Sequence, residues 1–270
     1  KTLQIFYLTY NNLTVLPDMS MVKKLGKLDC AYNKIKKIEK AFGSDVVLVQ
    51  LSMDYNQIEE LPRDGSGSFC GYADVESFSF AHNKLKKFPK ILFDTNSQVS
   101  ALGLNGNGIE EIPKGTFNAS KYSYMMKTFD LTYNHLSKLP DDFNGKNMPF
   151  LYGVDLSNNR FTEVPTGPMD AATLTVYAVR NQRDENGNRL LRKWPGNLGL
   201  CPSLRQFCIG GNDLRKISDT ISSAIIVFEI KDNPNISLNL SNVCDLIKEG
   251  RYLLIYDPEQ DIRGCDYLKE

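Results

Sequence analysis

The sequence has few of the residues on which catalytic and metal sites are built. Its 270 residues include two histidines, one tryptophan and six cysteines, and no two cysteines have the Cys-x-x-Cys spacing of a zinc site. A Gly-x-Ser-x-Gly nucleophile motif and the Gly-Lys-Ser/Thr end of a phosphate-binding loop are also missing. These absences remove the usual signatures of hydrolases and nucleotide-binding enzymes, so we expect a non-enzymatic protein with no metal and no cofactor.

An excess of charge of one sign and long apolar runs are lacking as well. Lys plus Arg and Asp plus Glu both number 32, which argues against a nucleic-acid partner. No apolar run approaches the roughly 18 residues that cross a bilayer, so we expect no membrane insertion by this segment. The chain begins at Lys1 rather than Met, and we expect it to be a processed or truncated product.

Two features come near to a functional site and fall short of one. His82 and His135 each lie beside an asparagine of the repeat described next, and we interpret both as surface or turn residues. The stretch from Asp184 to Asn188 imitates the start of a calcium loop, but it lacks the glycine at position six and the glutamate at position twelve. A flexible polar hairpin is the better interpretation of that stretch.

What the sequence does contain is one pattern, L-x-x-L-x-L-x-x-N-x-L-x-x-L-P, that recurs in phase from Leu3 to about Asn233. We number the ten units as coils 1 to 10, and successive asparagine positions are 21 to 30 residues apart. The asparagine position holds Asn11, Asn33, Asn56, Asn83, Asn107, Asn134, Asn159, Gln182, Asn212 and Asn233. Coil 8 has Gln182 at this position and about seven extra residues, at about 183–190, which include Asn186-Gly187. Because Asn-Gly is a strong hairpin signal, we predict a small protruding hairpin or loop there.

The pattern predicts a stack of coils. The alternating L-x-L core is a short strand with one buried face, and equivalent strands of neighbouring coils pair into a parallel sheet. Stacked Asn side chains satisfy the backbone groups of the turn, and Gln182 does so with a longer reach. Phe42, Phe93, Phe117 and Phe143 form a second buried row. Short return segments such as 162–169 are irregular or 3₁₀, while longer ones such as 86–96 and 140–148 have room for a helical turn.

These motifs resemble the leucine-rich-repeat family, and the Leu-Pro or Ile-Pro that closes most units resembles cell-surface proteins of the Bacteroides type. The resemblance implies an α/β fold, a right-handed horseshoe of about ten repeats with a concave parallel sheet, and an extracellular or bacterial cell-surface location. We expect the array at residues 1–238 and a C-terminal cap at residues 239–270. It also implies a role in binding a ligand or a protein, without naming the ligand.

The two ends of the array differ. We predict that 242–249 form a helix and 251–256 a last strand, with Cys244 and Cys265 one repeat length apart on either side of it. That spacing suits a disulfide, and two unpaired thiols are the alternative. The first coil has no visible cap, so either a preceding domain was removed or something outside this chain covers the first strand.

Three slots in each coil point from the concave face or its rim, and they define the candidate ligand-binding surface. Its residues are Tyr7, Tyr10, Asp29, Tyr32, Asp54, Tyr55, His82, Asn105, Asp130, Tyr133, Asp155, Asn158 and Arg180. Tyrosine is a favoured binding residue because it combines contact area with a polar tip. The alternative is that the tyrosines stack on one another and stiffen the edge of the sheet.

Three functions fit this surface. The first is binding of a protein or peptide partner, and the second is binding of a glycan, with sugars stacked on tyrosine faces. The third is a structural or adhesin scaffold for a missing N-terminal domain. The sequence leaves the oligomeric state open.

Overall fold

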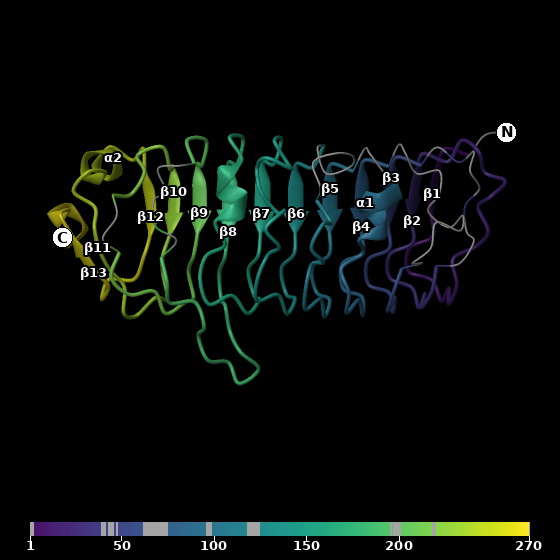
Figure 1. Cartoon of the computed structure of the whole chain (residues 1–270), viewed down its shortest axis with the longest axis horizontal. Helices are drawn as coiled ribbons and strands as arrows, with labels where there is room; N and C mark the ends of the chain where they lie inside the picture. Colours follow the sequence, from purple (N-terminus) through teal and green to yellow (C-terminus); the bar gives the residue numbers. More distant parts are fainter. Residues whose placement is uncertain are drawn as a thin grey trace.

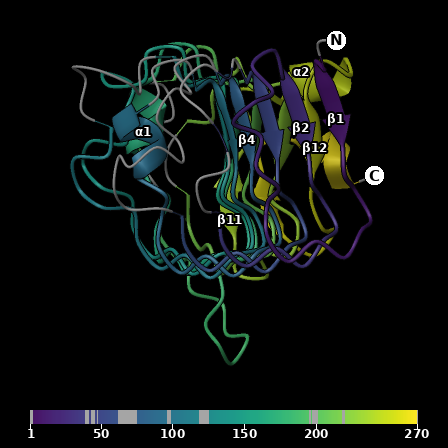
Figure 2. The ribbon, with the colours of Figure 1, turned by 90° about the vertical axis from the view of Figure 1, so that its right-hand side faces the viewer.

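The computed structural model describes residues 3–38, 42, 46, 48–61, 75–95, 99–117, 125–194, 196, 201–217 and 220–269. The chain winds into a row of stacked coils with one strand from each coil in a common parallel sheet (Figure 1). The sheet lies on one side of the coils and helix α1 (Ile91–Thr95) on the opposite side (Figure 2). The predicted leucine-rich-repeat solenoid is therefore confirmed.

The main sheet has eleven strands in chain order, except that β12 follows β10 directly. These strands are β1 (Ile5–Tyr7), β2 (Lys27–Asp29), β3 (Gln50–Ser52), β4 (Ser77–Ser79), β5 (Ala101–Gly103), β6 (Thr128–Asp130), β7 (Gly153–Asp155), β8 (Val176–Ala178), β9 (Gln206–Cys208), β10 (Val227–Glu229) and β12 (Leu253–Ile255). Their register aligns the second apolar position of every coil, as in the pairing of Phe78 with Leu102. Parallel strands with one side chain facing the core and two facing outward follow from the L-x-L pattern.

Each buried asparagine closes the turn after its strand as the sequence predicts. Asn134 accepts a hydrogen bond from Ile109 N (3.0 Å) through Oδ1 and donates Nδ2 to the carbonyls of Leu104 and Leu131. The amide therefore bonds to both its own coil and the preceding one. Gln182 takes the same place in coil 8, donating Nε2 to Leu156 O (2.9 Å).

The second buried row is also confirmed. Phe42, Phe93, Phe117 and Phe143 are all buried, and the Phe117 ring packs edge-on against the rings of Phe93 (5.1 Å between centroids) and Phe143 (4.9 Å). The return segments carry helix α1, which lies within the range 86–96 predicted to have room for a helical turn, and the 3₁₀ turn η1 (Gly167–Asp170), which overlaps the end of the range 162–169 predicted to be irregular or 3₁₀.

The return at 140–148 is a series of turns, where the sequence leaves room for a helical turn. Its polar side chains bond to nearby backbone, because Asn147 donates to Asp142 O (2.8 Å) and Asn144 accepts from Asn147 N (3.0 Å). Asp142 in turn accepts from Phe117 N of the preceding coil. Short polar side chains that bond to the backbone in this way compete with helix formation.

The insert in coil 8 forms the predicted hairpin, which protrudes from the row of coils between β8 and β9 (Figure 1). Its base is an antiparallel bridge between Arg183 and Arg189. Both arginines pair with Asp232 of coil 10, so the hairpin is tied to the stack. At its tip, Asp184 accepts hydrogen bonds from the side-chain amide and the backbone N–H of Asn188 and from the backbone N–H of Asn186, and these bonds lower the pKa of its carboxyl.

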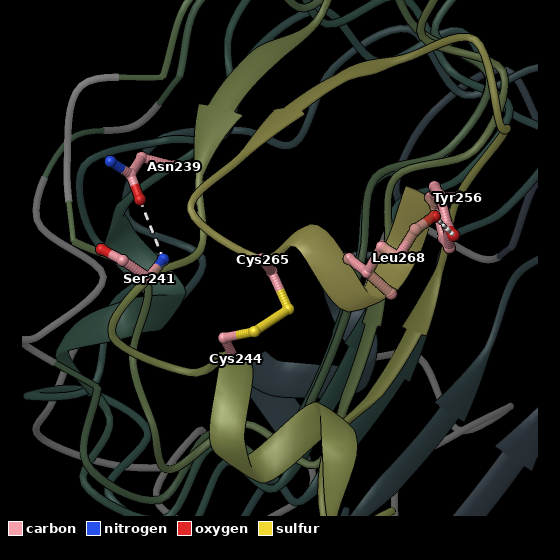
Figure 3. Close-up of a disulfide and its surroundings, with 6 residues drawn as sticks. All are labelled: Asn239, Ser241, Cys244, Tyr256, Cys265 and Leu268. Carbon is pink, nitrogen blue, oxygen red and sulfur yellow. Dashed lines mark hydrogen bonds between the residues drawn. A yellow bond between two sulfur atoms is a disulfide. The ribbon is translucent and has the colours of Figure 1, made fainter. Parts of the chain in front are cut away.

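The C-terminal end contains the predicted helix, α2 (Cys244–Lys248), and the predicted last strand, β12. Cys244 and Cys265 form a disulfide (Figure 3). A second sheet pairs β11 (Ser237–Asn239) with β13 (Asp261–Arg263), and η3 (Asp266–Lys269) follows. The predicted boundary between array and cap, after residue 238, falls inside β11. The division into array and cap stays a prediction.

Candidate functional site

The outward side chains of the main sheet form the strand face, and its carboxyl edge carries the aromatic rim. We define the aromatic rim as Tyr10, Tyr32, Tyr55, His82 and Tyr133, each of which directly precedes the repeat asparagine of its own coil. All five have left-handed backbone, with φ between 52° and 57°. The turn requires this conformation in every coil, and other coils meet it with Gly106, Asn158, Asn181, Gly211 and Asp232.

Four rim residues stack face to face. Ring centroids are 4.4 Å apart between Tyr10 and Tyr32, 4.4 Å between Tyr32 and Tyr55, and 4.2 Å between Tyr55 and His82. Burial within the stack and the neighbouring tyrosines raise the pKa of Tyr32. The stack ends at Gly106 of coil 5, which has no ring and whose position lies directly against the His82 ring. Tyr133 of coil 6 has no described stacking partner.

The stack covers the faces of the inner rings while it leaves part of each residue exposed. Tyr32 and Tyr55 are 41% and 43% exposed although each has an aromatic neighbour on both sides. A sugar ring stacks on an aromatic face, and both faces of Tyr32 and of Tyr55 are already covered by neighbouring rings. Hydrogen bonding to the hydroxyl edge is the contact that the inner rings offer a partner.

Stability alone does not account for these aromatics. A bulky residue in left-handed backbone costs about 1–3 kcal/mol. A stacked aromatic pair contributes about 0.5–1.5 kcal/mol beyond its buried area. The stack has three such pairs for four residues in left-handed backbone, and Tyr133 bears the cost without a described stacking partner.

The four predicted site aspartates are half-buried on the strand face and partly engaged by the backbone. Oδ1 of Asp29, Asp130 and Asp155 accepts a hydrogen bond from the amide two residues later, as in Ser157 N to Asp155 (2.9 Å). Asp54 accepts from Ser79 Oγ (2.6 Å) and Ala81 N (2.8 Å) of the next coil. These carboxylates therefore shape the turn as well as present charge.

Like charges lie close together on this face. Asp130 and Asp155 are register partners on β6 and β7. Burial raises the pKa of Asp155, Asp130 adds to that rise, and the hydrogen bonds from Ser157 and the charge of Arg180 oppose it. Burial likewise raises the pKa of Asp54, with a further contribution from Asp29.

Arg180 is committed to a contact inside the molecule. Its guanidinium forms an ion pair with the buried Glu229 (2.7 Å), reaching from coil 8 to coil 10. Gly210 of coil 9 leaves room for this bridge, since a side chain there would come within 2.9 Å of Glu229 Oε1. The predicted ligand role of Arg180 is thus joined to a structural one.

The other predicted site residues lie on the same surface. Tyr7 is exposed on β1, and the Lys27 ammonium sits 5.5 Å from the centre of its ring. Asn105 and Asn158 are half-buried after β5 and β7. The structure therefore brings the candidate residues onto one face, where Tyr7 and the aromatic rim are exposed.

The amino edge of the strand face also carries exposed side chains, which are not among the candidate residues predicted from the sequence. Large exposed side chains there include Tyr152, Ile226 and Leu253. Tyr152 and Ile226 directly follow the first apolar position of their coils, before the strand begins, and Leu253 directly precedes the strand residue Leu254 that pairs with Phe228. Strand alternation predicts that Leu253 faces outward, but it gives no signal for Tyr152 and Ile226.

The described part of the chain holds no group of three or more His, Cys, Asp or Glu side chains arranged for a metal ion. Among the described helices, none is long and apolar enough to cross a membrane. The described thiols outside the disulfide belong to Cys30, Cys201 and Cys208, and all three are buried. Cys70 lies outside the described residues.

Comparison with protein-family models finds no match. Among curated proteins, the chain is 27% identical to Tsukushi of Gallus gallus over 77% of this chain and 55% of that protein. It is 28% identical to keratocan of Coturnix japonica, over 80% of this chain and 60% of that protein. It is 30% identical to lumican of Oryctolagus cuniculus, over 62% of this chain and 81% of that protein. The chain thus spans little more than half the length of the first two.

Among solved structures, a leucine-rich repeat protein of Bacteroides eggerthii superposes with a TM-score of 0.76 and 39% identity, over 98% of this chain and 52% of that chain. A second, from Bacteroides thetaiotaomicron, gives a TM-score of 0.75 and 33% identity, over 98% of this chain and 38% of that chain.

Proposed function

The chain belongs to the leucine-rich-repeat family, and from that premise we propose that it is a non-enzymatic module that binds a protein or peptide partner through the strand face and the aromatic rim. Proteins with this fold generally serve as interaction modules. The finer statement, that this partner contacts the aromatic rim, rests on the geometry of the rim.

The observation that carries the proposal is tyrosine in left-handed backbone. Tyr10, Tyr32, Tyr55 and Tyr133 have φ of 53–57°, where glycine, asparagine or aspartate serves the other coils without the cost of a bulky side chain. Strain of this kind persists where it serves a function. Exposed tyrosine is also among the residues that dominate binding energy at protein interfaces.

The test uses a random peptide library displayed on phage and selected on the immobilised chain. Selected peptides are then titrated against three proteins by fluorescence polarisation. One is the unchanged chain, the second is the triple variant Tyr32→Asn/Tyr55→Asn/Tyr133→Asn, and the third is the control Tyr267→Asn. Asparagine suits left-handed backbone, so the triple variant keeps the fold, and Tyr267 is an exposed tyrosine of the cap, away from the rim.

We expect peptides that bind the unchanged chain and the control equally and bind the triple variant at least tenfold more weakly. Peptides that bind all three proteins equally contradict the role of the rim. The same proteins are applied to a glycan array, where signal that depends on the rim favours glycan binding instead.

We also propose an extracellular or cell-surface location. The disulfide between Cys244 and Cys265 supports this, since such bonds persist in oxidising compartments. Quantifying the free thiols of the protein isolated from its native source tests the proposal: a reduced pair argues for a reducing compartment.

A further inference from the structure

Charge is distributed unevenly over a chain whose formal charge is zero. We define the acidic half-face as the last residue of each strand and the second and third residues after it, in coils 1 to 7. Its charged members are Asp29, Asp54, Asp130 and Asp155, and it contains no lysine or arginine. The residues that follow the repeat asparagine are basic in coils 2 and 4, where they include Lys34, Lys36, Lys37, Lys84, Lys86 and Lys87.

From this distribution, and resting on the proposed function, we infer that the partner is a cationic peptide segment whose arginine and lysine side chains lie along the acidic half-face and against the aromatic rim. Guanidinium and ammonium groups pair with carboxylates and are attracted to aromatic rings, and the half-face offers both within reach of one another.

The chain itself shows this chemistry twice on the same face. At one end, the Lys27 ammonium lies 5.5 Å from the centre of the Tyr7 ring. At the other, the guanidinium of Arg180 pairs with Glu229 and its charge also acts on Asp155. Between these two ends, the half-face contains no lysine or arginine, although His82 acts on Asp54 and Arg180 acts on Asp155.

The electrostatic state of the aspartates favours a cationic partner. Burial raises the pKa of Asp54 and Asp155, and in each case a neighbouring aspartate adds to the rise. A bound cation between Asp130 and Asp155 relieves the repulsion of two register partners. Complementary charge of this kind gives specificity and depends on ionic strength.

The test uses the peptides selected from the displayed library, and it adds two charge variants of the protein. Asp130→Asn/Asp155→Asn removes two charges while each asparagine keeps an Oδ1 acceptor for the amide two residues later. The control Glu110→Gln/Glu111→Gln removes two charges from exposed side chains outside the half-face. Both variants have the same net charge, so a general charge effect moves them equally.

We expect peptides that depend on the rim to be enriched in arginine and lysine and to lose at least fivefold in affinity on the Asp variant but not on the Glu control. This loss shrinks in 0.5 M salt, where charges are screened over about 4 Å. Peptides that depend on the rim but lack basic residues, or bind the Asp variant unchanged, overturn the inference and leave the proposed function standing. If no selected peptide depends on the rim, the proposed function fails, and the inference fails with it.

Discussion

Tyrosine is a costly choice for the residue before a buried asparagine, because the turn holds that residue in left-handed backbone. Four coils of this chain accept the cost, and histidine fills the place in a fifth. The neighbouring rings recover part of the energy for Tyr32 and Tyr55. At the scale of the residue, the aromatic rim is therefore where exposed aromatic side chains replace the residues that left-handed backbone prefers.

Tyr133 offers the sharpest test of this strain, since it is 62% exposed and stacks on no described ring. We expect Tyr133→Asn to raise the free energy of unfolding by about 1 kcal/mol, because asparagine tolerates left-handed backbone. The reverse change one coil later, Asn158→Tyr, is expected to lower it by about the same amount. Urea unfolding measures both, and a lower stability of Tyr133→Asn contradicts the strain.

The pKa of Asp155 makes a prediction about pH. Because burial raises that pKa in the folded chain, the charged form opposes folding at neutral pH, and this penalty disappears as pH falls through the folded pKa. We expect Asp155→Asn to raise the melting temperature at pH 7, with a difference that shrinks in acid. Asp184, whose pKa is lowered, has the opposite sign, so Asp184→Asn lowers the melting temperature at pH 7 and the loss fades in acid. Melting curves from pH 7 down to the acid range check both signs.

At the scale of the element, each coil is closed by side chains from its neighbours. Asn134 bonds to the backbone of coils 5 and 6, and Arg189 in the hairpin of coil 8 donates to Asn212 O of coil 9 (2.8 Å). The end of the array follows the same rule. Gln260 donates to the carbonyls of Ile230 and Asn233, as an asparagine of an eleventh coil would. Coils are thus joined by nearest-neighbour contacts, which is how solenoids distribute their stability.

Two bridges from coil 8 to coil 10 are exceptions, because they span coil 9: one joins the hairpin arginines to Asp232, and the other joins Arg180 to Glu229. Removal of Arg180 leaves a buried carboxylate without its partner. We expect Arg180→Met to lower the free energy of unfolding by about 2 kcal/mol, less than for a fully buried pair because Arg180 is partly exposed. The double variant Arg180→Met/Glu229→Gln is expected to recover most of the loss in the same urea measurement. If the double variant is no more stable than the single one, the cost does not come from the stranded charge.

At the scale of the whole molecule, stability depends on how the row of coils ends. The last strand of the main sheet, β12, follows α2 directly, and the disulfide joins α2 to the segment after β13 (Figure 3). Nearby, Asn239 accepts from Ser241 N (2.8 Å) and Tyr256 donates to Leu268 O (3.0 Å). These contacts cover the end of the core where the repeat pattern stops.

Loss of the disulfide is expected to weaken this end first. Cys244 and Cys265 are 21 residues apart, and a loop of that size corresponds to about 3 kcal/mol of stabilisation. We expect Cys244→Ser/Cys265→Ser to speed amide hydrogen exchange in β12 and β13, while β2 to β6 keep their protection. Uniformly faster exchange in all strands would instead show that the array unfolds as one unit.

The sequence by itself determined the coils, their number and their core. The phase of the apolar positions and the buried asparagines are local patterns repeated down the chain, and the repetition makes them readable. The Asn186-Gly187 turn occurs in coil 8 alone and is readable because Asn-Gly is a strong hairpin signal. The slots of the aromatic rim follow from that phase as well. The likeness between coils also allowed Gln182 to be recognised as a substitute for asparagine.

Only the tertiary structure decided what the surface residues touch. The pairing of Arg180 with Glu229 joins residues 49 positions apart. The bond between Asp54 and Ser79 depends on how one coil is placed on the next. The turns at 140–148 replace a helix because their amides find backbone partners nearby. Such contacts depend on the length of each coil and on the direction in which each side chain points. The position of a residue within the repeat specifies neither.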